Sequence, residues 1–193
     1  MSSVLEFYSD RLERLQCERG FIEEGLILRR GKTQDPYTIS DHKNVIVPLG
    51  TKIANGDLIK RIDHELQDQF IIVAKQIGAD CVSMQGKRIN SFIDIYQISN
   101  KLDDHHRKVG LKEELVLKNI PSYCEDQSAY NQFYDAGYLP KVVKKFFVQP
   151  DDRIKDMQRI KSDDGMFQID DIAKDKYRDV WVIQVSEDAR KTV

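Results

Sequence analysis

The stretch DLIKRIDHELQDQFIIVAKQIG, residues 57–78, decides the predicted fold. Its apolar residues recur at intervals of three and four, which places them on one stripe of a helix. They are Ile59, Ile62, Leu66, Phe70, Val73 and Ile77. Asn55 or Asp57 can cap the start of such a helix, and Gly78 can close its end. The pattern predicts a long amphipathic helix over residues 57–77.

Strand signals surround this segment. DCVSM (80–84) and RINSFIDIYQI (88–98) are joined by a short QGK turn, which predicts a hairpin over residues 80–98. The apolar segments EGLILRR (24–30) and NVIVPL (44–49) predict two further strands.

The first residues of the chain predict another helix, over residues 3–19. Ser3 and Glu6 have the spacing of a capping box. Leu5, Tyr8, Leu12 and Leu15 follow at helical intervals, and Gly20 stands where a helix would end.

These elements predict an α+β protein in two halves. Residues 1–100 form an α/β unit, in which the long helix covers a small sheet. Residues 101–112 lie in the most polar stretch of the chain and are predicted as a linker. Residues 113–193 form an α+β unit that ends in the β-branched strand DVWVIQV (179–185). A single continuous domain is the alternative.

Composition limits the function classes. The 193 residues carry 30 Lys and Arg against 32 Asp and Glu, a net charge of -2, so any binding of nucleic acid needs a local patch. Three cysteines (Cys17, Cys81 and Cys124) are too far apart for a zinc knuckle and indicate a reducing compartment. No apolar run approaches the roughly 20 residues that cross a bilayer. We expect a cytoplasmic protein without membrane contact.

The segment LVLKNIP (115–121) resembles the first-strand motif of the RNA recognition motif family. The resemblance implies a βαββαβ order over residues 114–193, which is a ferredoxin-like arrangement. The helix after this strand would present Ala129, Tyr130, Phe133 and Ala136, and a second helix would lie in IDDIAKDKY (169–177). The remaining strands would lie in KVVKKFFVQ (141–149), GMFQI (165–169) and WVIQV (181–185).

The chemistry of that family is missing from the segment. The family stacks bases on aromatic side chains of its central strands, yet the first-strand position holds Val116. The candidate third strand offers only Phe167, and four carboxylates that would repel phosphate surround it. They are Asp163, Asp164, Asp170 and Asp171.

A second candidate for nucleic-acid contact is YLPKVVKKFF (138–147). Its lysines could contact a phosphate backbone and its aromatic residues could stack on bases. The candidate contacts are Tyr138, Lys141, Lys144, Lys145 and Phe147. The alternative, which we favour, is that Phe146 or Phe147 packs in the core and the lysines are solvated.

Residue types for catalysis or metal binding show no recognisable pattern. Asp103, Asp104, His105 and His106 form the densest group of metal-ligand types, but four adjacent residues point in different directions. The chain lacks phosphate-binding glycine loops, nucleophile elbows and HExxH motifs, so we assign no catalytic residue, metal or cofactor. We expect a non-enzymatic accessory or regulatory protein that binds another protein. The alternatives are single-strand nucleic-acid binding through the C-terminal half and a metal-dependent nuclease with scattered acidic residues.

Overall fold

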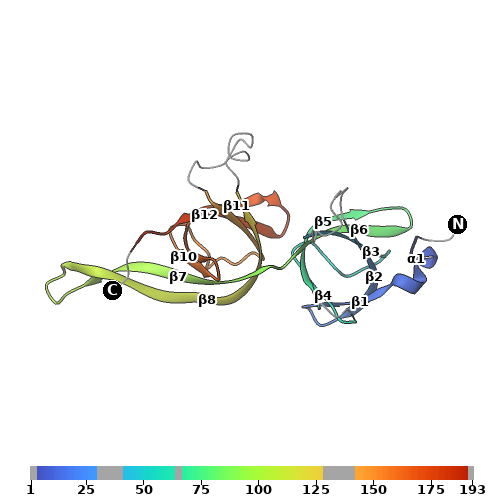
Figure 1. Cartoon of the computed structure of the whole chain (residues 1–193), viewed down its shortest axis with the longest axis horizontal. Helices are drawn as coiled ribbons and strands as arrows, with labels where there is room; N and C mark the ends of the chain where they lie inside the picture. The colour runs from blue at the N-terminus through green and yellow to red at the C-terminus, as the bar shows by residue number, and fades with distance from the viewer. Residues whose placement is uncertain (1–3, 30–40, 64–66, 128–141, 191–193) are drawn as a thin grey trace. The chain divides into compact units, whose positions relative to one another are not determined.

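The computed structural model describes residues 4–29, 41–63, 67–127 and 142–190, and within them the protein is almost entirely β. Its strands form two closed barrels of six strands each (Figure 1). Two compact units result, the first formed by Met1–Ile89 and Tyr177–Val180 and the second by Asn90–Lys176 and Trp181–Val193.

The first barrel uses β1 to β6, which pair in the order β1-β2-β3-β6-β5-β4 and close through β4 and β1. A short helix, α1 (Val4–Phe7), and a 3-10 turn (Ser9–Arg11) precede it. The strands are β1 (Glu13–Cys17), β2 (Ile22–Arg29), β3 (His42–Pro48), β4 (Leu58–Arg61), β5 (Gln69–Ile77) and β6 (Cys81–Arg88).

The second barrel uses β7 to β12, which pair in the order β10-β11-β12-β9-β8-β7 and close through β7 and β10. The strands are β7 (Ser91–Leu102), β8 (Lys108–Asp126), β9 (Lys144–Val148), β10 (Arg159–Ser162), β11 (Gly165–Tyr177) and β12 (Val180–Glu187).

The two barrels have the same topology. When β7 to β12 are counted as the first to sixth strands of their own barrel, both closed orders read first, second, third, sixth, fifth, fourth. β7 therefore corresponds to β1, and β8 corresponds to β2. The chain contains a structural repeat that its sequence pattern does not reveal.

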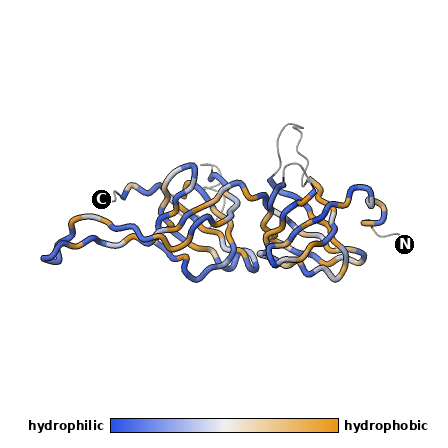
Figure 2. Tube along the Cα trace, turned by 90° about the horizontal axis from the view of Figure 1, so that it is seen from below, coloured by the Kyte–Doolittle hydropathy of each residue, from blue (hydrophilic) through white to orange (hydrophobic). Residues whose placement is uncertain are grey.

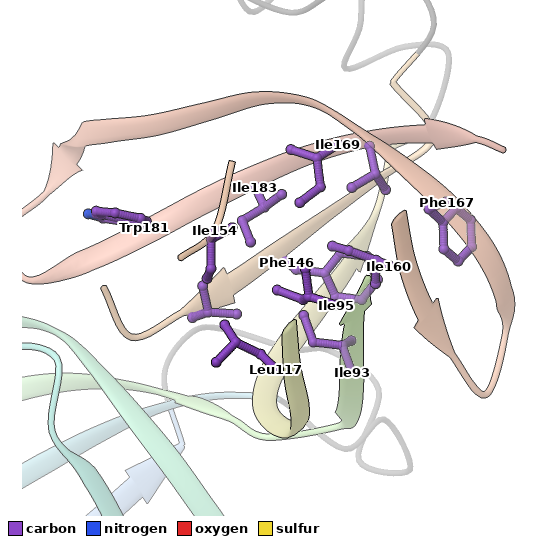
Figure 3. Packing of buried hydrophobic residues seen from close by; sticks show 12 residues of the cluster. Ile93, Ile95, Leu117, Phe146, Ile154, Ile160, Phe167, Ile169, Trp181 and Ile183 are labelled. Carbon is purple, nitrogen blue, oxygen red and sulfur yellow. The ribbon is translucent and has the colours of Figure 1, made fainter. Parts of the chain in front are cut away.

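Each barrel encloses its own apolar core. In the second barrel Ile95, Phe146, Phe167 and Ile183 come from four different strands and pack together inside it (Figure 3). The rings of Phe146 and Phe167 lie 6.1 Å apart between centroids. Burial of a side chain of this size contributes about 1.5–3 kcal/mol. The core of the first barrel includes Leu15, Val45, Val47, Ile59, Phe70, Ile72 and Met84.

The predicted α+β class and its long helix are wrong. Residues 57–77 contain the strands β4 and β5. The reason lies in the run Phe70–Val73, whose four consecutive side chains are all buried. A strand that is covered on both faces needs such a continuous apolar run, and the run also satisfies the three-and-four spacing of a helix. Leu66 lies outside the described residues.

The predicted N-terminal helix over residues 3–19 is also largely wrong, since only Val4–Phe7 is α-helical and Leu15 lies in β1.

The predicted hairpin over residues 80–98 is wrong in its pairing. Both of its strands exist, as β6 and β7, but they do not pair with each other. β6 pairs with β3 and β5, whereas β7 pairs with β8 and β10. The strands predicted at 24–30, 44–49 and 179–185 are confirmed as β2, β3 and β12.

The ferredoxin-like order of the C-terminal half is wrong as well. LVLKNIP lies within the long strand β8, and the predicted helix at 169–177 is part of β11. The predicted helix residues 129–136 lie outside the described residues. The predicted linker, 101–112, comprises the end of the β7–β8 hairpin and its turn. Whether the two halves fold independently stays a prediction.

Candidate functional site

The β7–β8 hairpin extends past the barrel to which it belongs (Figure 1). β7 pairs with β10 only through Asp94, Ile95 and Tyr96, and β8 pairs with β9 only from Tyr123 to Asp126. Between these contacts and the turn, β7 and β8 pair with each other alone. We call residues 97–115 the arm. No buried residue of either core lies in it.

One face of the arm carries four aliphatic side chains among the polar residues Asn100, Lys108 and Glu113. Side chains alternate between the two faces of a strand, and directly paired residues of antiparallel strands share a face. Ile98 and Leu102 of β7 therefore share a face with Leu111 of β8, which is paired with Asn100 between them. Leu115 lies on this face beside Tyr96. We call Ile98, Leu102, Leu111 and Leu115 the apolar face of the arm.

The apolar face is open to solvent. Leu102 is 53% exposed and Leu115 is 47% exposed. Val109, next to the turn, is 50% exposed. Figure 2 shows hydrophobic residues along the strands of the arm and hydrophilic residues at its end. An aligned group of exposed aliphatic side chains differs from the single ones that occur on most protein surfaces.

The opposite face and the turn carry four cations together with the carboxylates of Asp103, Asp104 and Glu114. Lys112 is paired with Ser99, and Lys101 is paired with Gly110, so the two lysines are diagonal neighbours. Arg107 and Lys108 lie at the turn, and all four cations are exposed. None of them forms an ion pair with a carboxylate in the part of the chain that the structure describes. Glu114 lies on the same face as Lys101 and Lys112, and Lys108 is paired with Leu102 of the apolar face.

Asp103 shapes the turn of the arm. Its Oδ1 accepts hydrogen bonds from the backbone N–H of His105 at 2.9 Å and of Arg107 at 2.8 Å. The backbone of His106 has a left-handed φ of 62°, which the tight turn requires. Asp103 therefore acts as a turn residue.

The predicted metal-ligand group lies in this turn. Asp103, Asp104, His105 and His106 are consecutive residues at the end of the arm. No group of three or more His, Cys, Asp or Glu among the described residues is arranged to hold a metal ion. The turn geometry accounts for Asp103 without a metal.

A buried ion network fixes the base of the arm to the barrel. Arg159 of β10 is 1% exposed and hydrogen-bonds Glu113 of the arm. Its Nε donates to Asp188 Oδ2 at 2.7 Å, and Asp188 also accepts from Arg190 Nε at 2.8 Å. Lys161 donates to the other oxygen of Glu113 at 2.6 Å. The network connects the arm, β10 and the segment that follows β12.

The network also changes the acidity of its carboxyl groups. Burial alone would raise the pKa of Glu113, but hydrogen bonds from Lys161 and Arg159 outweigh it and lower the pKa. The pKa of Asp188 is lowered strongly, because hydrogen bonds from Arg190 and Arg159 outweigh the effect of burial. Both groups are held as carboxylates.

The predicted nucleic-acid contacts do not form an accessible surface in the described residues. Phe146 points into the barrel core, and Phe147 is 3% exposed, as the favoured alternative expected. Lys145 is 6% exposed. Lys144 is not merely solvated, since its Nζ donates to Asp126 at 2.6 Å and to Asp164 at 3.1 Å. Tyr138 and Lys141 lie outside the described residues.

Two of the three cysteines, Cys17 and Cys124, are poor nucleophiles. Burial raises the pKa of the Cys124 thiol to about 11, and burial also raises the pKa of Cys17. A thiol is reactive as a thiolate, so both are protonated at neutral pH. A surface depression of about 660 Å³ is lined by residues that include Asp170, Ser186, Asp188 and Arg190, and its Asp188 and Arg190 already pair with each other.

Comparison with known proteins adds no assignment: no family model, curated protein or solved structure matches the chain. Among the described residues, no helix is long and apolar enough to cross a membrane.

The arm was missed by sequence reasoning because its polar composition is that of a linker. The available signal was the alternation of Ile98, Asn100 and Leu102 against Val109 and Leu111.

Proposed function

We propose that this chain is a non-enzymatic accessory factor that binds another protein through the apolar face of the arm. The observation that carries the proposal is the alignment of Ile98, Leu102, Leu111 and Leu115 on a projecting two-stranded ribbon. The barrel core does not need these side chains, since its apolar cluster is complete without them. Exposed apolar surface that is fixed in place typically marks a binding site.

The arm also offers backbone groups for binding. Beyond Tyr96 the outer edge of β7 has no third strand within the described residues. Open edges are templates for an added strand. Burying the exposed parts of Leu102, Val109 and Leu115 contributes about 1 kcal/mol each, which does not cover the cost of association alone. Strand addition at the open edge would supply further affinity.

The non-enzymatic role and the cytoplasmic location belong to this proposal. The raised pKa of Cys17 and Cys124 argues against a thiol nucleophile at these two positions. Cys17, Cys81 and Cys124 are all free thiols, which is typical of proteins from reducing compartments.

The test compares two double variants of the intact protein. In one, Leu102→Ser with Leu115→Ser removes the apolar face; in the other, Lys101→Ser with Lys112→Ser changes the opposite face. Each protein is immobilised and exposed to lysate of its own source cells, and bound proteins are quantified by mass spectrometry. We expect a stoichiometric partner that binds the wild type and the lysine variant and falls at least about tenfold with the leucine variant, the loss that corresponds to about 1.4 kcal/mol.

Two results would overturn the proposal. One is the absence of any stoichiometric partner of the wild type, and the other is a partner that the leucine variant retains. Since both leucines are about half exposed, the leucine variant should keep its melting temperature. Melting curves therefore separate a binding defect from misfolding.

A further inference from the structure

We propose that the open edge of β7 in the arm pairs with the same edge of a second copy of this chain, which gives a two-fold symmetric dimer. The strand that adds to the open edge is then β7 of the second copy. Directly paired residues share a face, so the two apolar faces lie side by side and stay uncovered. The dimer contact uses backbone groups and does not depend on the proposed protein partner.

The hydrogen bonds of the turn show which backbone groups face the open edge. The N–H of Asp103 donates to the carbonyl oxygen of Arg107 at 2.9 Å, so the backbone of Asp103 faces β8. Backbone groups alternate in direction along a strand, and the extra residue of the adjacent bulge, Val109, lies in β8. The odd-numbered residues of this part of β7 therefore face β8, and the even-numbered residues face outward. The outward-facing residues are Ile98, Asn100 and Leu102.

The open edge lacks a strong hydrogen-bond partner at Ile98. The carbonyl oxygen of Ile98 accepts a hydrogen bond from Nε2 of the neighbouring Gln97 side chain, at 3.4 Å. A bond of this length is weaker than a strand-to-strand bond. A two-stranded ribbon in water is also only marginally stable without a third strand or a covered face. A strand paired along residues 98–102 would supply shorter bonds and would stabilise the arm.

The sequence of this edge is complementary to itself. In an antiparallel pair centred on Asn100, Ile98 lies opposite Leu102 of the second copy, and Asn100 lies opposite Asn100. Each of these pairs joins outward-facing residues and can exchange both backbone hydrogen bonds. The aliphatic pairs add side-chain contact, and the two amides can hydrogen-bond to each other. Ser99 lies opposite Lys101, so no like charges are directly opposed.

The neighbouring registers are less favourable. A pair centred on Ser99 would need the outer edge of Tyr96, which is already paired with Arg159 of β10. A pair centred on Lys101 would place two lysines directly opposite each other, which is destabilising. The register centred on Asn100 avoids both conflicts.

The dimer should be weak and should strengthen with salt. An edge of residues 98–102 is much smaller than the roughly 1,200–2,000 Å² of a stable interface. The two copies of Lys101 would be diagonal neighbours, on the face that also carries Lys112 and Glu114. Salt screens exposed charges of this kind. Raising the salt concentration and replacing the lysine, as Lys101→Ser, should both favour the dimer.

The first test measures the mass of the intact protein by analytical ultracentrifugation between about 5 μM and 1 mM, the range of weak association. We expect an equilibrium between monomer and dimer. Asn100→Pro removes an outward-facing N–H and leaves the bonds of the hairpin in place. It should weaken the dimer at least about tenfold, whereas Asn100→Thr keeps the N–H and should still dimerise.

The second test uses charge to verify the register. Asn100→Lys and Asn100→Asp each place like charges directly opposite each other in the proposed dimer. Each variant alone should dimerise at least about tenfold more weakly than the wild type, and an equimolar mixture of the two should form heterodimers. Gln76→Lys and Gln76→Asp, at an exposed position of the first barrel, are the matched controls and should leave the dimer unchanged.

The third test locates the contact by amide hydrogen exchange, followed residue by residue with NMR. The outward-facing amides of Ile98, Asn100 and Leu102 should exchange more slowly at high protein concentration, because they become hydrogen-bonded in the dimer. The amides of Ser99 and Lys101 already face β8 and should not change.

Four results would overturn this inference. They are a monomer at about 1 mM protein, a dimer that Asn100→Pro leaves intact, no heterodimer from the charge variants, and new protection at Leu111 and Glu113 of β8 in place of β7. A lost dimer with a retained protein partner would contradict this inference alone, and the reverse would contradict the proposed function alone. Melting curves of each variant separate a lost dimer from a lost fold.

Discussion

The two barrels share one strand order but differ in their first hairpin. In the first barrel this hairpin is short, with five residues in β1 and eight in β2. In the second barrel the corresponding strands have 12 residues in β7 and 19 in β8. Strands of the shorter length suffice to close a barrel of this topology. The additional length of β7 and β8 therefore serves something other than the core, which is why the arm is the candidate site.

The barrels also differ in how they use charge. The first barrel pairs Arg14 with Asp63 at 2.6 Å, and both side chains are about half exposed. The second barrel buries the pair Arg159 and Asp188, with side chains 1% and 0% exposed. Exposed pairs contribute little to stability, whereas breaking a buried pair leaves an uncompensated charge. The Arg159–Asp188 pair should therefore matter more to stability than the Arg14–Asp63 pair, although the first barrel also holds the mostly buried pairs of Arg61 with Glu13 and Asp68.

The largest expected effects test whether each barrel has its own core. Phe70→Ala in the first barrel and Phe146→Ala in the second should each lower the free energy of unfolding by about 3–5 kcal/mol, because both side chains are fully buried. Hydrogen exchange read strand by strand should locate the first loss of protection in the barrel that carries the change. Ile77→Ala and Met166→Ala, at exposed positions, are the controls. Equal loss in both barrels from either change would contradict two separate cores.

A smaller effect is expected from the ion network. Asp188→Ala should cost about 3 kcal/mol, because it removes a buried carboxylate partner of the buried Arg159. The matched change in the first barrel, Asp63→Ala, should cost less than about 1 kcal/mol. Trp181 is the single tryptophan and lies in the core of the second barrel, so its fluorescence in a denaturant titration reports on that barrel. Similar costs for the two changes would remove the contrast in charge.

Sequence patterns predicted individual strands better than the way they are assembled. β2, β3 and β12 were predicted because each is a short apolar run between turn residues, a local property. The stretch 57–77 failed because Ile59, Phe70 and Val73 fit the spacing of a helix and also that of two buried strands. Only pairing with distant strands decides between them, and Ile59 pairs with Cys17, far away in the chain.

The candidate site was harder to predict than the fold elements. A strand in a barrel has apolar residues on the face that it buries, and this pattern can be recognised in the sequence. The arm packs neither face into a core, so its sequence has the polar composition of a linker. Arg159 was not singled out either, because its partners Glu113 and Asp188 lie 46 and 29 residues away in the chain. Long-range ion networks leave no local spacing to find.

The dependence of stability on pH should separate the barrels further. Glu113 and Asp188 have pKa values in the folded state below their ordinary values of 4.5 and 3.8. A carboxyl group whose pKa is lower in the folded state than in the unfolded state stabilises the fold. This stabilisation is fully present above the unfolded-state pKa and is lost as the pH falls through the folded-state pKa. The second barrel should therefore lose stability progressively as the pH falls below about 4.5, seen as a falling denaturant midpoint of Trp181 fluorescence. Asp188→Ala should weaken that dependence, and an unchanged slope would contradict the role of the network.

Shortening the β7–β8 hairpin should have the smallest effect on stability and the largest effect on function. Residues 100–111 can be replaced by Asn-Gly, which joins the paired residues Ser99 and Lys112 through a tight two-residue turn and gives the second barrel a short first hairpin like that of the first. Glu113 stays in place and keeps its bond to Arg159. Since the deleted residues belong to neither core, the free energy of unfolding should change by less than about 1 kcal/mol. Capture of the protein partner should be lost, because the deletion removes Leu102 and Leu111 from the apolar face of the arm. If the shortened protein unfolds, the arm is needed for the fold of the barrel. If it folds and still captures the protein partner, the arm is not the binding site.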